Sequence, residues 1–237
     1  MPHYALAGHV FVCLQGEHVV FLDVLKDRYF ALEARQTASL GAIVPGWPVA
    51  ATPRASEMPC DETSSSILAL LLEQGLLSAD ERDSKPATPV CVPPITSELS
   101  ADAYPDTTRA SLASVASFTT SAIRASLMLR FRGFARVVER VRLRNLRHAA
   151  DGFDAQRAHR LVATFAALRP FFFTAKDMCL FEALALSELL ARHDLFPHWV
   201  FGVQARPFAA HCWLQHRAIL LNDTLDHVQR YTPIMVV

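Results

Sequence analysis

Three residue types that can perform nucleophilic catalysis occur in order in the last third of the sequence. Cys179 stands at the start of an apolar run with helical spacing, His211 lies in the strand-like run Ala-Ala-His-Cys-Trp-Leu, and Asp223 follows the next apolar run. A thiolate can attack a carbonyl carbon, an imidazole can move the proton, and a carboxylate can fix the orientation of the imidazole. The three residues are therefore candidates for a Cys-His-Asp triad.

The expected position of Cys179 suits a nucleophile. The pattern from Cys179 to about Arg192 is apolar almost all round, which predicts a buried helix. In the first turn of a helix, a thiol meets unpaired backbone N–H groups and the positive end of the helix dipole, and both favour the thiolate. The same N–H groups could stabilise an oxyanion. A single cysteine is more often a small buried hydrophobic residue, so catalysis depends on the other two residues.

Two strand-like runs should carry the imidazole. Residues 199–203 and 209–216 are separated by a short turn, so they should pair antiparallel. Because side chains alternate along a strand, His211 and Trp213 share one face of the second strand, whereas Cys212 points to the other. We expect His211 to face the thiol, and Trp213 to shield the site and contact the substrate.

The carboxylate that orients His211 is expected at the end of the following strand. Asp223 is the first choice, and Asn222 or, more weakly, Asp226 could serve instead. A histidine in a strand is more often a structural or solvent-facing group than a catalytic one. The case for catalysis is the combination of the three residues.

Metal and nucleotide chemistry are poorly supported by the sequence. Cys179, His211, Cys212 and His216 offer zinc-binding atoms, but they form no closely spaced pair of the kind found in zinc sites, and His211 and Cys212 should point to opposite faces. The chain has only 8 glycines and no Gly-rich phosphate loop. We therefore expect neither a metal ion nor a cofactor.

The elements that must position these residues suggest two domains of an α+β protein. Residues 1–83 have strand patterns followed by helix patterns, which is typical of a small winged-helix-like module. Residues 84–106 hold five prolines among Ser, Thr and Asp, which excludes helix and central strand and predicts a linker. Residues 107–237 begin with helical patterns and end with the candidate triad.

Composition indicates a cytoplasmic protein. Hydrophobic residues make up 51% of the chain, and the mean hydropathy is +0.20, which suggests apolar surface covered by a partner. No uncharged apolar run is long enough for a membrane span, and no secretory signal is visible. The five cysteines are odd in number and scattered, which favours a reducing compartment over a disulfide framework.

Charge is unevenly distributed along the chain. Residues 1–106 contain 6 basic and 14 acidic residues, whereas residues 107–237 contain 17 basic and 9 acidic ones. Eight arginines and one glutamate lie between Arg124 and Arg147. Such a run could bind nucleic-acid phosphates, but it is more often a solvated helix face or a face packed against acidic residues. No aromatic interleaving of this run suggests base stacking, so we expect no nucleic-acid partner.

The last part of the chain carries an ordered set of residues: Cys179-Leu-Phe-Glu-Ala-Leu-Ala-Leu, Gly202-Val203, Pro207-Phe-Ala-Ala-His211-Cys-Trp213, Leu221-Asn-Asp223, Tyr231 and Ile234. With these residues it resembles the lasso-peptide biosynthesis B proteins, which are transglutaminase-like cysteine peptidases. The resemblance covers about residues 150–237 and implies a papain/transglutaminase-like fold with catalytic roles for Cys179, His211 and Asp223. Cys212 stands where family members usually have Ala, and Leu214-Gln215 where Val-Glu is common.

The N-terminal module is similar to the precursor-recognition element of the same family, and to the small winged-helix peptide chaperone of pyrroloquinoline quinone biosynthesis. The matching run is Phe21-Leu-Asp-Val-Leu-Lys-Asp-Arg-Tyr-Phe-Ala-Leu32. Such modules bind an extended leader peptide as an added strand at a sheet edge. The resemblance implies that Leu22, Asp23 and Tyr29 bind the leader.

Together the two resemblances imply a leader peptidase. The enzyme would bind the leader of a ribosomally made lasso-peptide precursor and cleave it from the core. An asparagine-synthetase-like cyclase, the second expected partner, would then join the new amine of the core to an Asp or Glu side chain. Two alternatives remain. One is acyl transfer to an amine, which uses the same residues, and the other is a peptide-binding scaffold in which the triad geometry is incidental or degenerate.

Overall fold

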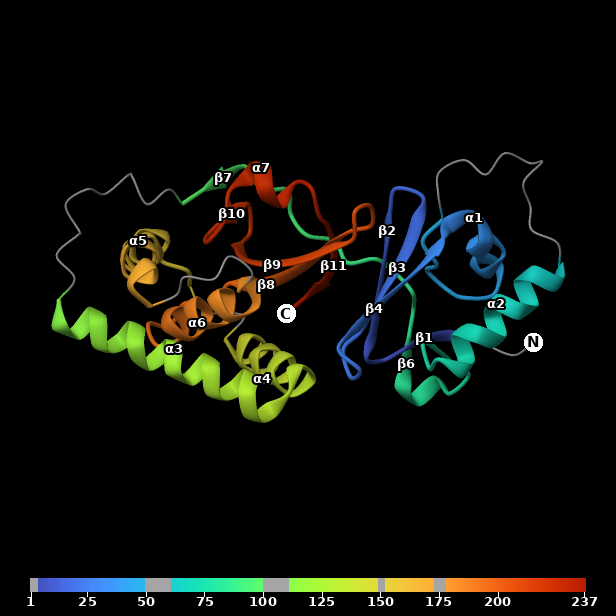
Figure 1. Ribbon diagram of the computed structural model, residues 1–237, viewed down its shortest axis with the longest axis horizontal. Helices are drawn as coiled ribbons and strands as arrows, with labels where there is room; N and C mark the ends of the chain where they lie inside the picture. The colour runs from blue at the N-terminus through green and yellow to red at the C-terminus, as the bar shows by residue number, and fades with distance from the viewer. Residues whose placement is uncertain (1–3, 50–60, 100–110, 149–151, 173–177) are drawn as a thin grey trace. The chain divides into compact units, whose positions relative to one another are not determined.

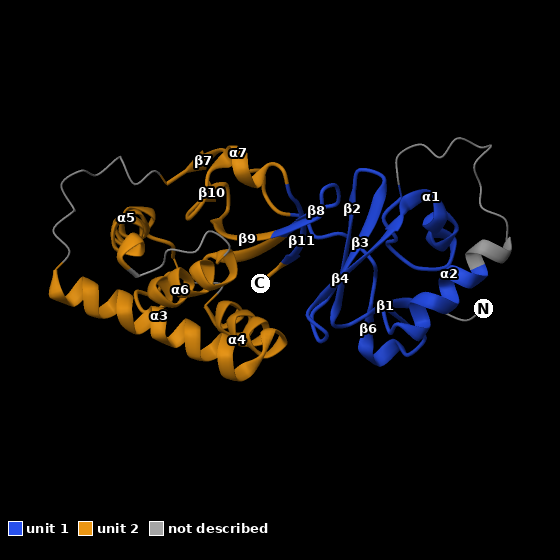
Figure 2. Cartoon of the chain, in the orientation of Figure 1, with its two compact units in different colours: residues 1–91, 202–210, 231–235 blue, residues 92–201, 211–230, 236–237 orange. Residues whose placement is uncertain are grey.

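The computed structural model describes residues 4–49, 61–99, 111–148, 152–172 and 178–237. It is 45% helical and 25% strand, which confirms the expected mixture of helix and sheet. The chain divides into two compact units (Figure 2). Unit 1 comprises residues 1–91, 202–210 and 231–235, and unit 2 comprises residues 92–201, 211–230 and 236–237.

An antiparallel three-stranded sheet forms the centre of unit 1. Its strands are β2 (Val10–Gln15), β3 (His18–Asp23) and β4 (Arg28–Glu33), in that order. The turns between them pass through Gly16 at φ 59° and Asp27 at φ 49°, the left-handed conformation that tight hairpins require. The strand patterns expected in this part of the chain are confirmed.

A second small sheet and several helices complete unit 1. Its buried core includes Phe21, Leu40, Trp47, Leu71 and Leu76. The helix pattern that follows β4 becomes one short α-helix and one 3₁₀ turn. The winged-helix comparison stays a prediction. The elements are β1 (Ala5–Ala7) between β5 (Leu77–Ser78) and β6 (Ser84–Lys85), with α1 (Ala34–Thr37), η1 (Ala38–Ala42), α2 (Asp61–Glu73) and η2 (Glu81–Asp83).

The proline-rich stretch contains short strands at both ends of its described part. Strand β6 lies in unit 1, and β7 (Ser97–Glu98) pairs in parallel with β10 (Ile219–Leu220) at the edge of the sheet in unit 2. Edge pairing is the kind of strand contact that a proline-rich segment permits. The expected boundary residues after Leu99 lie outside the described part of the chain.

The rest of the chain combines helices with a five-stranded sheet. Strand residues within 202–210 and 231–235 belong to unit 1, and the other strand residues of this sheet belong to unit 2. The strands follow the order β11-β8-β9-β10-β7. Helix α3 packs along α6, and α5 contacts both helices (Figure 1). The remaining elements are α3 (Leu112–Arg132), α4 (Phe134–Arg147), α5 (Ala155–Phe172), α6 (Cys179–Ala191), β8 (His198–Gln204), β9 (Ala209–His216), α7 (Leu225–Val228) and β11 (Thr232–Val236).

Helix α6 is buried as its sequence predicts, and it holds an acidic residue in that environment. Glu188 is only 3% exposed. Arg144 Nη1 lies 2.5 Å from Glu188 Oε1, and Arg124 Nε lies 2.6 Å from Glu188 Oε2. Arg144 also donates to Ser187 Oγ over 2.6 Å. Two of the arginines in the basic run therefore fix α3 and α4 to the helix that begins with Cys179.

Helix α3 is long and mostly apolar. By length and composition it could cross a membrane, which is weak evidence because a packed helix of a soluble protein passes the same test. One face of α3, including Phe118, Ala122 and Ala125, is buried. Phe118 lies 5.1 Å from Phe165 of α5, measured between ring centroids. This face of α3 packs within unit 2, and the expected lack of a membrane span stays a prediction.

Candidate active site

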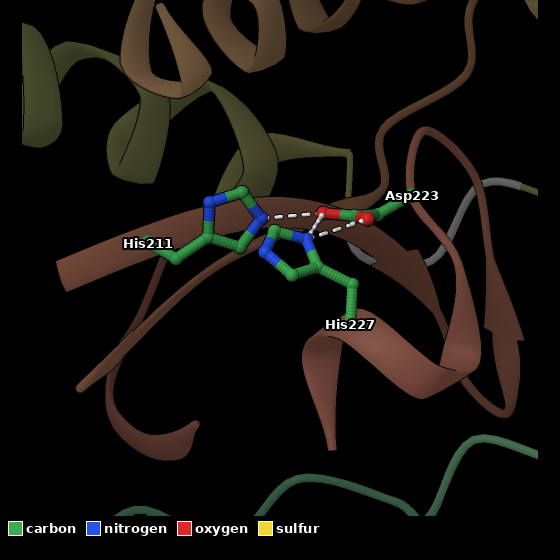
Figure 3. A group of neighbouring side chains, drawn as sticks. All are labelled: His211, Asp223 and His227. Atoms are coloured by element: carbon green, nitrogen blue, oxygen red, sulfur yellow. Dashed lines mark hydrogen bonds and ion pairs between the residues drawn. The ribbon is translucent and has the colours of Figure 1, made fainter. Parts of the chain in front are cut away.

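The three expected catalytic residues come from three elements of unit 2 and lie together. Cys179 is the first residue of α6, His211 lies near the start of β9, and Asp223 follows β10. His211 Nε2 donates a short hydrogen bond to Asp223 Oδ2 (Figure 3). Cys179 makes a hydrogen bond with the His211 side chain. The structure thus joins thiol, imidazole and carboxylate in a continuous chain of contacts.

The surroundings of Cys179 favour its thiolate. A hydrogen bond from the Cys212 thiol is the largest influence, and burial opposes it. His211 also lowers the pKa of Cys179, through a hydrogen bond and through its positive charge, and the Cys212 backbone contributes a further hydrogen bond. Together these contacts lower the pKa of Cys179 to about 4. At neutral pH the sulfur atom is therefore a nucleophilic thiolate.

His211 is the matching cation. Burial alone would lower its pKa, but the hydrogen bonds with Asp223 and Cys179, and the negative charges of both groups, raise the pKa of His211 to about 9. Because the two pKa values lie on either side of neutrality, the resting form is a thiolate–imidazolium ion pair.

Cys212 lies closer to the nucleophile than the alternation of side chains suggests. His211 and Trp213 do share a face, with ring centroids 6.1 Å apart. The alternation places Cys212 on the other face of β9, yet both its thiol and its backbone hydrogen-bond to Cys179. Cys212 is 2% exposed, and burial raises its pKa far above the ordinary value, so it acts as a donor.

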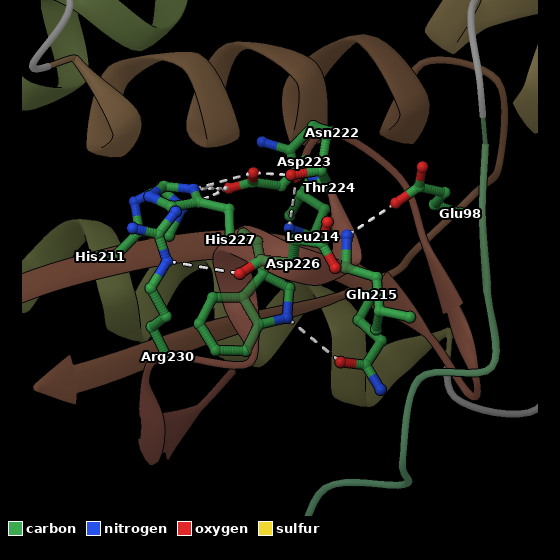
Figure 4. A network of polar contacts seen from close by, with 12 residues as sticks. Glu98, His211, Leu214, Gln215, Asn222, Asp223, Thr224, Asp226, His227 and Arg230 are labelled. Atoms are coloured by element: carbon green, nitrogen blue, oxygen red, sulfur yellow. Dashed lines mark hydrogen bonds and ion pairs between the residues drawn. The ribbon is translucent and has the colours of Figure 1, made fainter.

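Asp223 is the carboxylate in contact with His211. Burial would raise its pKa, but hydrogen bonds from His211, from the Thr224 backbone N–H and from His227 leave the pKa of Asp223 below its usual value. Asn222 is engaged elsewhere, because its Oδ1 accepts a hydrogen bond from the Leu214 N–H over 2.7 Å (Figure 4).

His227 is a site residue that sequence reasoning missed. It lies on the short helix α7, and its Nδ1 is 2.9 Å from Oδ1 and 3.1 Å from Oδ2 of Asp223. Its ring centroid lies 4.5 Å from that of His211. The available signal was its position four residues after Asp223, where a turn of helix brings the two side chains together.

His211, Asp223 and His227 also offer nitrogen and oxygen atoms within 4.8 Å of one another, a spacing compatible with a metal site. Direct hydrogen bonds account for the arrangement, however. The expectation of no metal stays a prediction.

Glu182, one helical turn after Cys179, is a second residue near the site that the sequence did not indicate. Its Oε1 lies 3.2 Å from Arg169 Nε. Burial and the negative charges of Cys179 and Asp223 raise the pKa of Glu182, and the charge of Arg169 opposes this shift. Both Glu182 and Asp223 line a cavity of about 340 Å³. The apolar part of its wall consists of Leu99, Val162, Phe165, Ala166, Leu186 and Leu221.

Trp213 is buried beside His211 and is 2% exposed. Its Nε1 donates to Gln215 Oε1 over 3.2 Å. Gln215 Nε2 donates to the carbonyl oxygens of Pro93, over 2.8 Å, and of Arg217, over 2.5 Å. Trp213 therefore covers one side of the imidazole, and a single amide ties it to the proline-rich segment. Its predicted contact with substrate stays a prediction.

The residues expected to bind a leader peptide lie on β3 and β4 of unit 1. Leu22 is fully buried, and Asp23 is 1% exposed. Asp23 Oδ1 accepts a hydrogen bond from the Lys26 N–H over 3.0 Å, which stabilises the turn between the strands. Tyr29 is half-buried, with its ring centroid 5.5 Å from that of Phe208. Their contact with a peptide stays a prediction.

Comparison with known proteins agrees with the site geometry at the level of the superfamily. Neither the curated proteins nor the solved structures include a significant match to this chain. Residues 121–236 match the family model described as Transglutaminase-like superfamily. Members of this superfamily are typically cysteine peptidases or acyltransferases. The matched range includes Cys179, His211 and Asp223, so the second half of this chain carries a domain of the transglutaminase-like superfamily.

Proposed function

We propose that this protein is a cysteine peptidase that removes the leader from a ribosomally made lasso-peptide precursor. The observation that carries the peptidase assignment is the chain of hydrogen bonds from Cys179 through His211 to Asp223, an arrangement that favours a thiolate–imidazolium pair. The resemblance of both halves of the sequence to the lasso-peptide B proteins supports the choice of substrate.

Each residue then has a defined step in the reaction. The Cys179 thiolate attacks the carbonyl carbon of the scissile peptide bond, and backbone N–H groups at the start of α6 stabilise the oxyanion. The His211 imidazolium gives its proton to the leaving amine, which frees the core peptide and leaves the leader as a thioester. Neutral His211 next removes a proton from water, which attacks the thioester and regenerates the thiolate. Asp223 stays ionised throughout and orients the imidazole.

Leader recognition is assigned to unit 1. Among the described residues, no strand pairs with the outer edge of β4, so a leader could add there as a further antiparallel strand. Tyr29 lies on this edge strand, while Leu22 and Asp23 would act by shaping the sheet next to it. Binding the leader raises the local concentration of the leader–core junction near Cys179.

The product suggests the next reaction. Cleavage leaves a core peptide with a free α-amine, which an ATP-using, asparagine-synthetase-like cyclase would join to a side-chain carboxyl group. We place both steps in the cytoplasm, where free cysteines remain reduced.

A cleavage and binding experiment with one precursor peptide tests the proposal. Cys179→Ala should abolish cleavage, as measured by mass spectrometry, and should retain binding, as measured by fluorescence anisotropy of a labelled precursor. Cys91→Ala is the matched control, because Cys91 is an exposed free cysteine, and it should cleave normally. Cleavage by Cys179→Ala at the wild-type rate would exclude the mechanism.

Acyl transfer to an amine uses the same thioester. The alternative is tested by adding an amine such as hydroxylamine to the wild-type reaction. A leader that ends in a carboxylic acid without the additive supports hydrolysis, whereas a product formed only with the amine supports an acyltransferase.

A further inference from the structure

An apolar stripe on α3 remains exposed in unit 2. Ile123 is 55% exposed, Leu127 50% and Phe131 71%. The residues are four positions apart, so they form one ridge along the helix. We call them the α3 stripe. The opposite face of α3 is the one buried in unit 2, which leaves the stripe uncovered by the part of the chain that the structure describes.

The α3 stripe borders a wide, open groove on the surface. The groove has a volume of about 570 Å³ and is lined by the stripe together with Thr120, Arg124, Met128, Arg132 and Arg140. Arg140 belongs to α4, so the groove reaches from one helix to the next. A concave apolar surface of this kind accepts side chains that protrude from a partner.

The charge around the groove is positive. Helix α3 has no Asp or Glu in its 21 residues. Arg124 forms an ion pair with Glu188, which it shares with Arg144, but none of the described acidic residues forms an ion pair with Arg132 or Arg140. The only acid of α4, Glu139, lies 3.6 Å from Arg142. The groove therefore offers apolar contact with two arginines available at its edge.

We propose that this groove binds an acidic amphipathic helix of a partner protein. Leucine-like side chains of the partner would pack on the α3 stripe, and its Asp or Glu residues would pair with Arg132 and Arg140. The inference is independent of the peptidase assignment, because it uses no residue of the candidate active site.

Two other occupants fit the groove less well. A second copy of this chain would bring its own Arg132 and Arg140 against the same residues, with no acid on α3 to compensate. An anionic membrane satisfies the charge and could take up the exposed ridge, but the groove continues beyond that helix face to Arg140 of α4, which favours a protein helix over a lipid surface. The shape and sign of the surface together select an acidic helix.

A pair of synthetic helical peptides, used with the full chain, tests this inference. Both are as long as α3 and have leucine at the a and d positions of each heptad. One has glutamate at e and g, and the other has lysine there. By fluorescence anisotropy, the acidic peptide should bind at least about tenfold more tightly than the lysine peptide.

Three variants show whether the groove is responsible. Leu127→Ser with Phe131→Ser should weaken binding of the acidic peptide by at least about tenfold. Arg132→Glu with Arg140→Glu should reverse the preference in favour of the lysine peptide. The matched control is Arg160→Glu, which changes an exposed arginine on α5 and should leave the preference unchanged. Unchanged melting temperatures establish that each variant is folded.

Three results would overturn the proposal. One is equal binding of the two peptides. Another is stripe-dependent binding to vesicles with about 30 mol% phosphatidylserine in the absence of peptide binding, which would assign the surface to a membrane. The third is a dimer in light scattering that the stripe substitutions dissociate, which would assign it to a second copy.

Discussion

His227 Nδ1 lies 2.9 Å from Oδ1 of Asp223, the carboxylate that also accepts a hydrogen bond from His211. Two imidazoles therefore hold one carboxylate from either side, and the Thr224 N–H binds it over 2.7 Å as well. A carboxylate with three donors has little freedom to rotate away from His211. His227 thus acts on the imidazole through Asp223, as a positioning residue.

Loss of His227 should therefore lower kcat and leave KM nearly unchanged. His227→Ala removes one of the donors to Asp223, and we expect kcat to fall by about tenfold, as for other residues that orient a catalytic group. His227→Asn should recover part of the rate, because its amide can donate to the same carboxylate. His198→Ala, which alters an exposed histidine on β8, is the control. A kcat unchanged in His227→Ala would contradict the assignment.

Activity should be bell-shaped in pH, with limbs set by the ion pair. Below a pKa of about 4, Cys179 is protonated and loses its nucleophilic form. Above a pKa of about 9, His211 loses the proton that it gives to the leaving amine. The profile of kcat/KM should thus rise near pH 4 and fall near pH 9, with the two values belonging to the coupled pair.

Alkylation by iodoacetamide measures the same thiolate without a substrate. Cys179 should react at pH 5 to 6, where ordinary thiols are protonated. In His211→Ala, the reaction should begin at higher pH, because the positive partner is gone. Reaction of wild-type Cys179 only above about pH 8 would contradict the ion pair.

Cys212 should contribute to the low pKa of its neighbour. Cys212→Ala removes the thiol donor, which is the largest influence on the pKa of Cys179. The pH above which iodoacetamide alkylates Cys179, here called the acid limb, should therefore be higher in this variant. Cys212→Ser keeps a donor and should shift the limb less. Cys91→Ala is an exposed control and should leave the limb in place. Equal profiles for Cys212→Ala and the wild type would show that the thiol has no such role.

The sequence identified the candidate site where chemistry and local periodicity agree. The apolar run after Cys179 predicts α6, and the alternation in residues 209–216 predicts β9 with His211 and Trp213 on one face. These features depend on neighbours in sequence, so local patterns reveal them.

Contacts between distant segments were beyond the reach of such patterns. The approach of Cys212 to Cys179 depends on how α6 lies against β9, and the role of His227 depends on a helix of only four residues. Likewise, Arg124 and Arg144 belong to the arginine-rich run, and the sequence does not distinguish the buried arginines of this run from the exposed ones. Only packing shows that these two hold Glu188 and that Arg132 and Arg140 lie at a groove.

Gln215 provides a final prediction, because its amide is used as both donor and acceptor. The side chain is 1% exposed, accepts from Trp213 Nε1 and donates to the carbonyl oxygens of Pro93 and Arg217. A carboxylate cannot donate, so Gln215→Glu would place a buried charge against two carbonyl oxygens. We expect a loss of about 2–4 kcal/mol in the free energy of unfolding, measured by chemical denaturation at pH 7.

The pH dependence of that loss distinguishes charge from shape. Burial should raise the pKa of the introduced carboxyl group, so it becomes protonated as the pH falls and can then donate one hydrogen bond. The deficit of Gln215→Glu relative to the wild type should therefore shrink between pH 7 and pH 5, whereas that of Gln215→Leu should stay constant. Gln229→Glu, at an exposed position, should show almost no deficit at either pH. A deficit of Gln215→Glu that is independent of pH would indicate that packing, and not the donated hydrogen bonds, sets the requirement for an amide beside Trp213.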